Sequence, residues 1–160
     1  MLEILMAITL VASAVTAGLV AGLFFGFAVA IMPALRTVPD RDFVDMMQRI
    51  NTTILNPWFL SVYIGAGVLI AASALIAVVN GHASVIAFTV AALVLYGGVL
   101  ALTGVRNIPL NVEFAAVDVD DSAHLSAARE RFEVPWCRFN VIRMGLAIGA
   151  VICLGVALLL

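Results

Sequence analysis

Four long stretches of apolar residues, separated by polar segments, dominate the chain. They cover about residues 4–33, 57–79, 83–106 and 136–159. A helix needs about 20 residues to cross the roughly 30 Å hydrocarbon layer of a bilayer, so each stretch is long enough. Strands without partners cannot satisfy their backbone groups in lipid, which leaves helices. The pattern therefore predicts an all-α fold, a four-helix transmembrane bundle in which residues 1–160 form a single integral membrane domain.

Residues that start or stop helices agree with these bounds. Pro33 is expected to end the first span, whereas Asn56 and Pro57 supply an N-cap and a first-turn proline for the second. Asn80 and Gly81 predict a turn before the third span. Because so few residues join the second and third spans, we expect these two helices to form an antiparallel hairpin.

The polar segment after the first span predicts a short amphipathic helix over about residues 40–55. Its apolar side chains recur at helical spacing and form one stripe, made of Phe43, Met46, Met47, Ile50 and Ile54. Asp45 and Arg49 form an i,i+4 pair on its flank. We expect this helix to lie in the membrane interface over the mouth of the bundle, and a surface anchor with no further role is the alternative.

The polar loop between the third and fourth spans is acidic at Asp118, Asp120 and Asp121. After these residues, Ser122 is expected to cap a short helix that runs through Arg131. The loop lacks the regular ligand spacing and the glycine turn of a calcium-binding loop. The simplest interpretation is a solvated connection.

Composition fixes the solvent of the chain. Hydrophobic residues make up 64% of the sequence, charged residues make up 11%, and the mean hydropathy is +1.19. An ordinary soluble domain is about 45–50% apolar and about 25% charged, so most of this surface must face the lipid bilayer. The net charge is -2 and the basic residues form no run, which argues against a nucleic-acid partner.

Neither the cysteines nor the histidines predict a metal site. Cys137 and Cys153 lie on one expected helix, about 24 Å apart, which is too far for a disulfide. His82 and His124 fall on opposite sides of the membrane, so they cannot bind one haem or metal ion together. We therefore predict no metal and no cofactor.

The arginines gather on one side of the membrane. Those near the two long loops are Arg36, Arg41, Arg49, Arg106, Arg129, Arg131 and Arg138, whereas the short turn and both termini carry none. The positive-inside rule places this side in the cytoplasm, with both termini outside the cell (inner) membrane. The alternative is that some of these arginines serve a site.

Glycines at four-residue spacing indicate close helix packing. They are Gly18, Gly22 and Gly26 in the first span, and Gly145 and Gly149 in the fourth. Such spacing lets helix backbones approach each other, either within one chain or between copies in a homo-oligomer.

Polar side chains cluster near the helix ends on the arginine-rich side. Trp136, Asn140 and Arg143 share one face of the fourth helix. The others are Arg106, Asn107 and Asn111 after the third span, Asn51 and Asn56 before the second, and Tyr63 on the second. An amide without partners in hydrocarbon is costly, so we interpret the set as a polar pocket that a ligand can enter. Singly, these residues also suit snorkelling, an aromatic belt or helix caps.

Four segments resemble a known family. They are GLFFGFAVAIMPAL (22–35), MQRINTTILNPWF (47–59), RNIPLN (106–111) and WCRFNVIR (136–143). In this order they are similar to motifs of the anthrone oxygenase-like family, small four-span membrane proteins that are mostly of unknown function in bacteria. Some fungal members are implicated in oxidising an anthrone with O2 to an anthraquinone, without a metal or flavin. Val141 stands where members of the family often have histidine.

The resemblance implies roles for several residues. Arg106 and Arg143 would donate to the enolate of the substrate, and Asn140 or Asn111 would orient its phenolic oxygens. Glu113 is the candidate base. Two functions stay open: a cofactor-independent oxygenase of a lipophilic aromatic substrate, and a non-catalytic bundle that binds a lipid or small molecule or joins a membrane assembly.

We predict that Ser122 lies on the cytoplasmic side and Ser84 on the outer side, because the arginines flank the long loops. Membrane-impermeant thiol reagents, applied to Ser84→Cys and Ser122→Cys variants in cells, measure this. Labelling of the cysteine at 122 from outside, with the cysteine at 84 protected, would mean an inverted topology.

Overall fold

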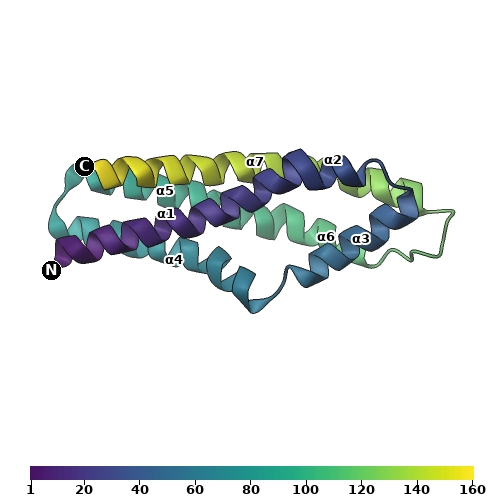
Figure 1. Cartoon of the computed structure of the whole chain (residues 1–160), viewed down its shortest axis with the longest axis horizontal. Coiled ribbons are helices and arrows are strands. Elements are labelled where there is room, and N and C mark those ends of the chain that lie inside the picture. The colour runs from purple at the N-terminus through teal and green to yellow at the C-terminus, as the bar shows by residue number, and fades with distance from the viewer.

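The computed structural model describes all 160 residues and contains only helices. They form four parallel columns (Figure 1). The first column is α1 (Leu2–Gly26), the π-helical turn η1 (Phe27–Ile31) and α2 (Met32–Leu35). The second is α3 (Asp40–Thr53) and α4 (Pro57–Asn80), and the third is α5 (Ala83–Leu102), the π-helical turn η2 (Thr103–Asn107) and α6 (Ile108–Ala115). The fourth is α7 (Leu125–Leu159).

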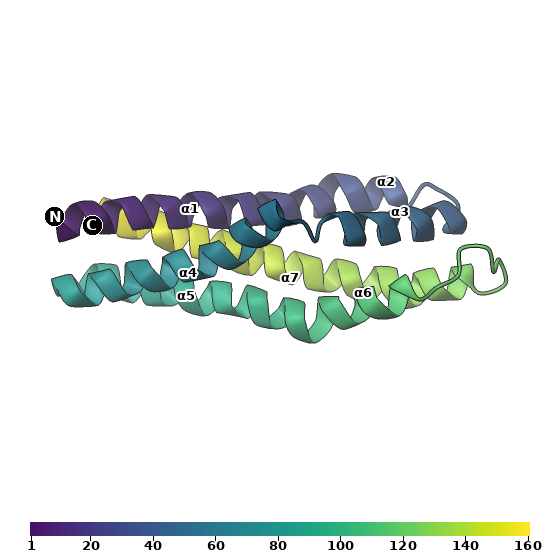
Figure 2. The same ribbon diagram turned by 90° about the horizontal axis from the view of Figure 1, so that it is seen from below.

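The columns form a closed bundle. Helix α1 packs against α4 and α7, and α5 packs against the same two helices, so α1 and α5 lie on a diagonal. Both termini and the α4–α5 turn lie at one end, which we call the terminal end, and the α2–α3 and α6–α7 connections lie at the loop end (Figures 1 and 2). Four helical segments are long and apolar enough to span a membrane, as predicted: Leu2–Leu35, Pro57–Asn80, Ala83–Ala115 and Leu125–Leu159.

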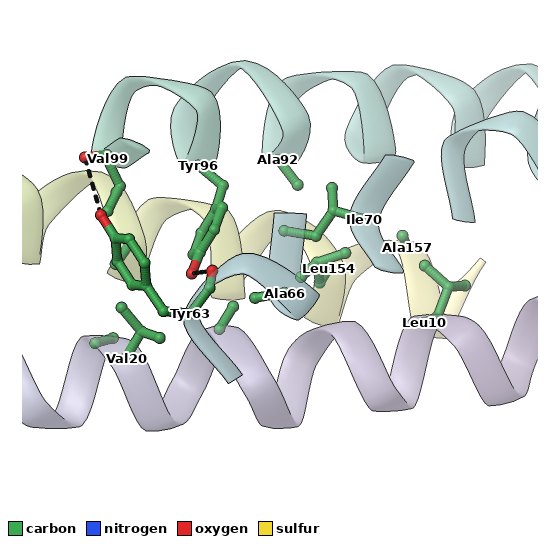
Figure 3. Packing of buried hydrophobic residues seen from close by; sticks show 14 of the residues in the cluster. Leu10, Val20, Tyr63, Ala66, Ile70, Ala92, Tyr96, Val99, Leu154 and Ala157 are labelled. Carbon is green, nitrogen blue, oxygen red and sulfur yellow. Dashed lines mark hydrogen bonds between the residues drawn. The ribbon is translucent and has the colours of Figure 1, made fainter. Parts of the chain in front are cut away.

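The terminal half of the bundle is held by a cluster of small and medium side chains. Ala66, Ala92 and Ala147 are fully buried in it, and their size lets the helices approach closely. The Tyr96 hydroxyl donates to the Tyr63 carbonyl at 2.7 Å and links α5 to α4 (Figure 3). We call this the terminal-end cluster.

The loop half has a second, aromatic cluster. Phe43 of α3 lies edge-on to Phe114 of α6, with 6.1 Å between ring centroids. Phe114 stacks in turn on Phe132 of α7 at 3.9 Å, and Trp136 extends the cluster toward the middle of the molecule. We call this the loop-end cluster.

Two prolines lie inside columns, each directly after a π-helical turn. The N–H of Met32, before Pro33, donates to the Phe27 carbonyl, five residues back. The N–H of Ile108, before Pro109, donates to Thr103 in the same way. A proline lacks the N–H donor and crowds the carbonyl four residues earlier, and a widened turn relieves both problems. The expectation that Pro33 ends the first span is therefore wrong, because the helix continues to Leu35.

The predicted start and end of α4 are confirmed. The Asn56 side chain accepts a hydrogen bond from the N–H of Phe59 at 3.0 Å, and Pro57 occupies the first turn. At the other end Gly81 has φ 71°, a left-handed conformation that favours glycine.

Helix α3 is amphipathic as predicted, but its direction differs from the expectation. It runs along the long axis of the bundle, not across its mouth (Figures 1 and 2). Its buried stripe of Phe43, Val44 and Met47 packs on protein, because α6 and α7 continue alongside it. The Gln48 amide fixes the register by donating to the carbonyls of Phe114 and Val117 at 3.0 and 2.9 Å.

The short helix expected after Ser122 is not a separate element. Helix α7 begins at Leu125, without a side-chain cap, and continues through Pro135 into the fourth span. The residues that suggested a short loop helix are the first turns of this long helix, which Phe132 anchors in the loop-end cluster.

The glycines of α1 do not pack within the chain as we favoured. A Cβ added at Gly18, Gly22 or Gly26 would meet no atom within 4 Å, so this stripe faces outward. Gly149 of α7 does approach another helix, since its added Cβ would lie 3.2 Å from the Leu95 side chain.

Arg129 of α7 fastens the α2–α3 connection. It donates to the Val38 carbonyl at 3.0 Å and to Asp40 at 2.9 Å, and it pairs with Glu133 at 3.0 Å. Its guanidinium also lies over the Phe43 ring, 4.4 Å from the centroid. One side chain thus holds the start of α3 in place.

We predict that Arg129→Gln lowers the melting temperature in detergent by about 5 °C, because hydrogen bonds to a charged group each contribute about 1.5–3 kcal/mol. The matched control is Arg41→Gln, since the Arg41–Asp120 pair is exposed at both partners. Circular dichroism melts of both variants measure the difference. Equal shifts would show that Arg129 has no special role in holding α3.

Candidate functional site

A cavity of about 230 Å³ lies where the two clusters meet, and all four columns contribute to its wall. Its apolar side is formed by Leu23, Phe24, Phe27, Ile50, Ile54, Leu55, Phe59, Leu60, Ile64 and Ile108. Its polar and amphipathic residues are Asn51, Tyr63, Thr103, Asn107, Asn111, Trp136, Asn140 and Arg143. The π-helical turns η1 and η2 both border it, through Phe27, Thr103 and Asn107.

Arg143 is the charged group of this wall, and its side chain is buried, with 6% of the residue exposed. Its guanidinium donates to the Thr103 hydroxyl at 3.1 Å and to the Asn140 carbonyl oxygen at 3.3 Å. It lies 4.4 Å from the centroid of the Phe24 ring and 5.9 Å from that of Trp136. Two neutral oxygens and two aromatic faces hold the cation.

Tyr63 and Thr103 extend this network. The Tyr63 hydroxyl donates to the Thr103 hydroxyl oxygen at 2.6 Å, and the Thr103 hydroxyl donates to the Val99 carbonyl at 2.8 Å. The Thr103 oxygen therefore accepts from both Tyr63 and Arg143. These bonds tie α4, η2 and α7 together at the wall of the cavity.

Two further hydrogen bonds fix the face of α7. The Asn140 amide donates to the Phe24 carbonyl of α1 at 3.0 Å, and the Trp136 indole donates to the Asn111 side chain at 3.1 Å. Together they hold the helical face that was predicted from the spacing of Trp136, Asn140 and Arg143.

Every buried side-chain polar atom that lacks a hydrogen-bond partner lies on a residue of this wall. They are the Asn51 Nδ2, both amide atoms of Asn107 and the Arg143 Nε. Such an atom costs about 1–3 kcal/mol when nothing bonds to it. Three donors and one acceptor are thus available to a polar group inside the cavity.

The rim of the cavity is apolar and exposed. Leu60 and Ile64 of α4 are 40% and 51% exposed, and Ile108 of α6 is 53% exposed. Helix α4 contains no charged residue, so this rim meets the lipid-facing surface of the bundle.

The structure brings most of the predicted site residues together, but not all. Seven line the cavity: Asn51, Tyr63, Asn107, Asn111, Trp136, Asn140 and Arg143. Arg106 is exposed, with its guanidinium 5.7 Å from the Phe139 ring centroid, so it does not meet Arg143. Glu113 lines a separate small surface pocket with Arg131, and Asn56 caps α4.

Two other expectations concern side-chain direction. Val141, at the position where the family often has histidine, is 50% exposed and is not part of the cavity wall. Trp58 is 84% exposed, which suits an interfacial belt, whereas Trp136 is buried.

Sequence reasoning missed Thr103 and the aromatic walls. Thr103 resembles the many threonines that bond to their own helix, and Phe24, Phe27 and Phe59 resemble ordinary lipid-facing residues. The available signal was position: each of the three phenylalanines lies in a segment that resembles the family. No aspartate, glutamate, histidine or cysteine lines the cavity.

We predict that Asn107→Leu leaves the melting temperature of the ligand-free protein unchanged or raised, because it removes a buried amide that bonds to nothing. Asn140→Leu is the matched comparison, since that equally buried amide donates to Phe24, and it should lower the melting temperature. Thermal melts in detergent measure both. A fall as large in Asn107→Leu as in Asn140→Leu would mean that the Asn107 amide has structural partners.

Comparison with known proteins gives one match. No curated protein and no solved structure matches the chain. The sequence model of the family described as anthrone oxygenase matches residues 58–153, which is more than half of the chain. The matched region runs from α4 into α7, and it includes Tyr63, Thr103, Asn140 and Arg143. This four-span membrane protein therefore belongs to the anthrone oxygenase family.

Proposed function

We propose that the cavity binds a lipophilic hydroxyaromatic molecule and that the protein oxidises this molecule with O2 at an anthrone-like ring carbon, without a cofactor. The observation that carries the proposal is the set of unpaired buried atoms on Asn51, Asn107 and Arg143, all at one cavity. A protein that only filled its core would lose nothing by replacing these groups with apolar ones. A ligand with its own donors and acceptors satisfies them.

The substrate enters from the bilayer. The rim residues Leu60, Ile64 and Ile108 are exposed on the apolar surface, so a hydrophobic molecule dissolved in lipid reaches the cavity without crossing water. Inside, Phe24, Phe27 and other aromatic rings offer flat surfaces to a planar ring system. Pockets of this kind combine apolar walls with a few polar groups that fix orientation.

The reaction converts a ring methylene and O2 into a ring carbonyl and water. Loss of one proton gives an enolate, which transfers one electron to O2, and the resulting radical and superoxide combine into a C–O bond. Protonation gives a hydroperoxide. Loss of water then breaks the O–O bond, removes the remaining hydrogen from the carbon and leaves the carbonyl. All atoms and electrons come from the substrate and O2.

The wall supplies orientation and charge stabilisation. Arg143 donates to the enolate oxygen through its free Nε and holds negative charge as it moves to oxygen. The Asn107 amide offers one donor and one acceptor to neighbouring hydroxyl and carbonyl groups of the substrate. Thr103 and Asn140 hold the Arg143 guanidinium in position.

A non-catalytic binding bundle is the second candidate. It is favoured by the composition of the wall, which contains no carboxylate or histidine that would remove a proton. The same cavity would then carry or store its ligand. The two candidates differ in O2 consumption.

We also propose that the protein lies in the inner cell membrane with its loop end in the cytoplasm. The arginines support this: Arg36, Arg41, Arg49 and Arg129 all lie at the loop end, and none lies at the terminal end. The cavity is then near the cytoplasmic edge of the hydrocarbon layer.

We predict that the protein in lipid nanodiscs consumes one O2 per molecule of 1,8-dihydroxyanthrone, and that Arg143→Lys lowers kcat/KM about 100-fold, because a planar fork of donors becomes a point charge. Arg106→Lys is the control, since Arg106 is exposed outside the cavity, and it should keep wild-type activity. An oxygen electrode measures both, with empty nanodiscs as the background. Binding of the anthrone without O2 consumption above this background would support the non-catalytic candidate and overturn the oxygenase.

A further inference from the structure

The Arg143 charge has no counter-ion. No carboxylate lies within ion-pair distance of its guanidinium, whereas Arg36, Arg41, Arg49 and Arg129 each pair with an acid. The remaining arginines are exposed. Arg143 is thus the one arginine that is both buried and unpaired. A buried cation is costly unless an anion accompanies it, so the site is electrically incomplete without a negative ligand.

The same wall has no group that takes up a proton. Its residues include no aspartate, glutamate, histidine or lysine. Tyr63 carries the only phenol, and its hydroxyl hydrogen is directed to Thr103 at 2.6 Å, whose own hydrogen is directed to the Val99 carbonyl at 2.8 Å. This chain of hydrogen bonds ends on a backbone carbonyl, so it leads no proton out of the cavity.

From these two observations we infer that the site binds its ligand as the conjugate base. The proton leaves to water at the membrane surface before the ring enters the cavity, and Arg143 selects the ionised form. This inference rests on the proposed function, because it concerns the ligand of the same cavity. It removes the need for a side-chain base, and it takes both Glu113 and the position of Val141 out of the proton-transfer step.

The ligand class follows from the free hydrogen-bonding atoms. The Arg143 Nε meets the ionised oxygen, and the Asn107 amide meets one acceptor and one donor close to it. The aromatic walls favour a flat ring system. A fused-ring aromatic compound with an acidic hydroxyl or enol next to a carbonyl meets all three requirements.

Two naphthoquinones of nearly equal shape test the inference. 2-Hydroxy-1,4-naphthoquinone ionises, whereas 2-methoxy-1,4-naphthoquinone cannot. Both quench tryptophan fluorescence, and Trp136 lies in the cavity wall, so a Trp58→Phe background, which changes only an exposed residue, isolates the signal. Nanodiscs of uncharged phosphatidylcholine exclude attraction of the anion by lipid.

We expect the hydroxy compound to bind at least about tenfold more tightly than the methoxy compound above its own pKa. Below that pKa its apparent Kd should rise about tenfold per pH unit, because only the ionised fraction binds. Arg143→Gln should abolish the preference, and Arg143→Lys, which keeps the charge, should retain part of it. The pH profile of the protein with Arg143 intact needs no substitution in the cavity, so it decides the question even if the Arg143→Gln protein does not fold.

The outcomes separate this inference from the proposed function. Equal and pH-independent binding of both compounds would overturn selection of the ionised form and leave the binding cavity intact. A preference that survives in Arg143→Gln would also overturn it, by assigning the selection to other charges. Binding of neither compound would overturn the inference together with its site. Because naphthoquinones have no ring methylene, a confirmed preference stands even if anthrone oxidation is not observed.

Discussion

The structure depends on one constraint, that each backbone N–H and C=O in the hydrocarbon layer must find its partner within the protein. A proline breaks this rule locally, and each column of this bundle contains one: Pro33, Pro57, Pro109 and Pro135. Two are accommodated by π-helical turns, and Pro57 starts a helix, where its missing N–H is not needed. The cavity lies beside these interruptions, between one cluster of closely packed small residues and another of aromatic rings.

The spans were predictable because length and apolarity alone specify a membrane helix. The cap at Asn56 and the turn at Gly81 were also predictable, since both signals act within a few residues. The behaviour of Pro33 was not, because the widened turn that absorbs it depends on the backbone upstream. The direction of α3 depends on partners distant in sequence: Phe114, which follows the third span, and Arg129, in the first turns of α7.

The site was predictable where helical spacing defines one face, as for Asn140 and Arg143. It was not predictable where a π-helical turn changes the spacing. Arg106 and Asn107 are neighbours in η2, yet Asn107 is buried at the cavity and Arg106 points outward. Charge attracts attention in an apolar sequence, but the amide beside it provides the unpaired atoms. Only coordinates show which of two adjacent residues faces inward.

The π-helical turn η2 also makes the molecule sensitive to chain length. A π turn holds one residue more than an α-helix needs over the same rise, and each α-helical residue turns the chain by about 100°. Loss of one residue from this turn would restore a regular helix and rotate α6 by about that angle. Asn111 would then leave Trp136, and Phe114 would leave both Phe132 and the amide of Gln48. In this protein a single-residue deletion, without any change of composition, would therefore dismantle the contacts of the loop half.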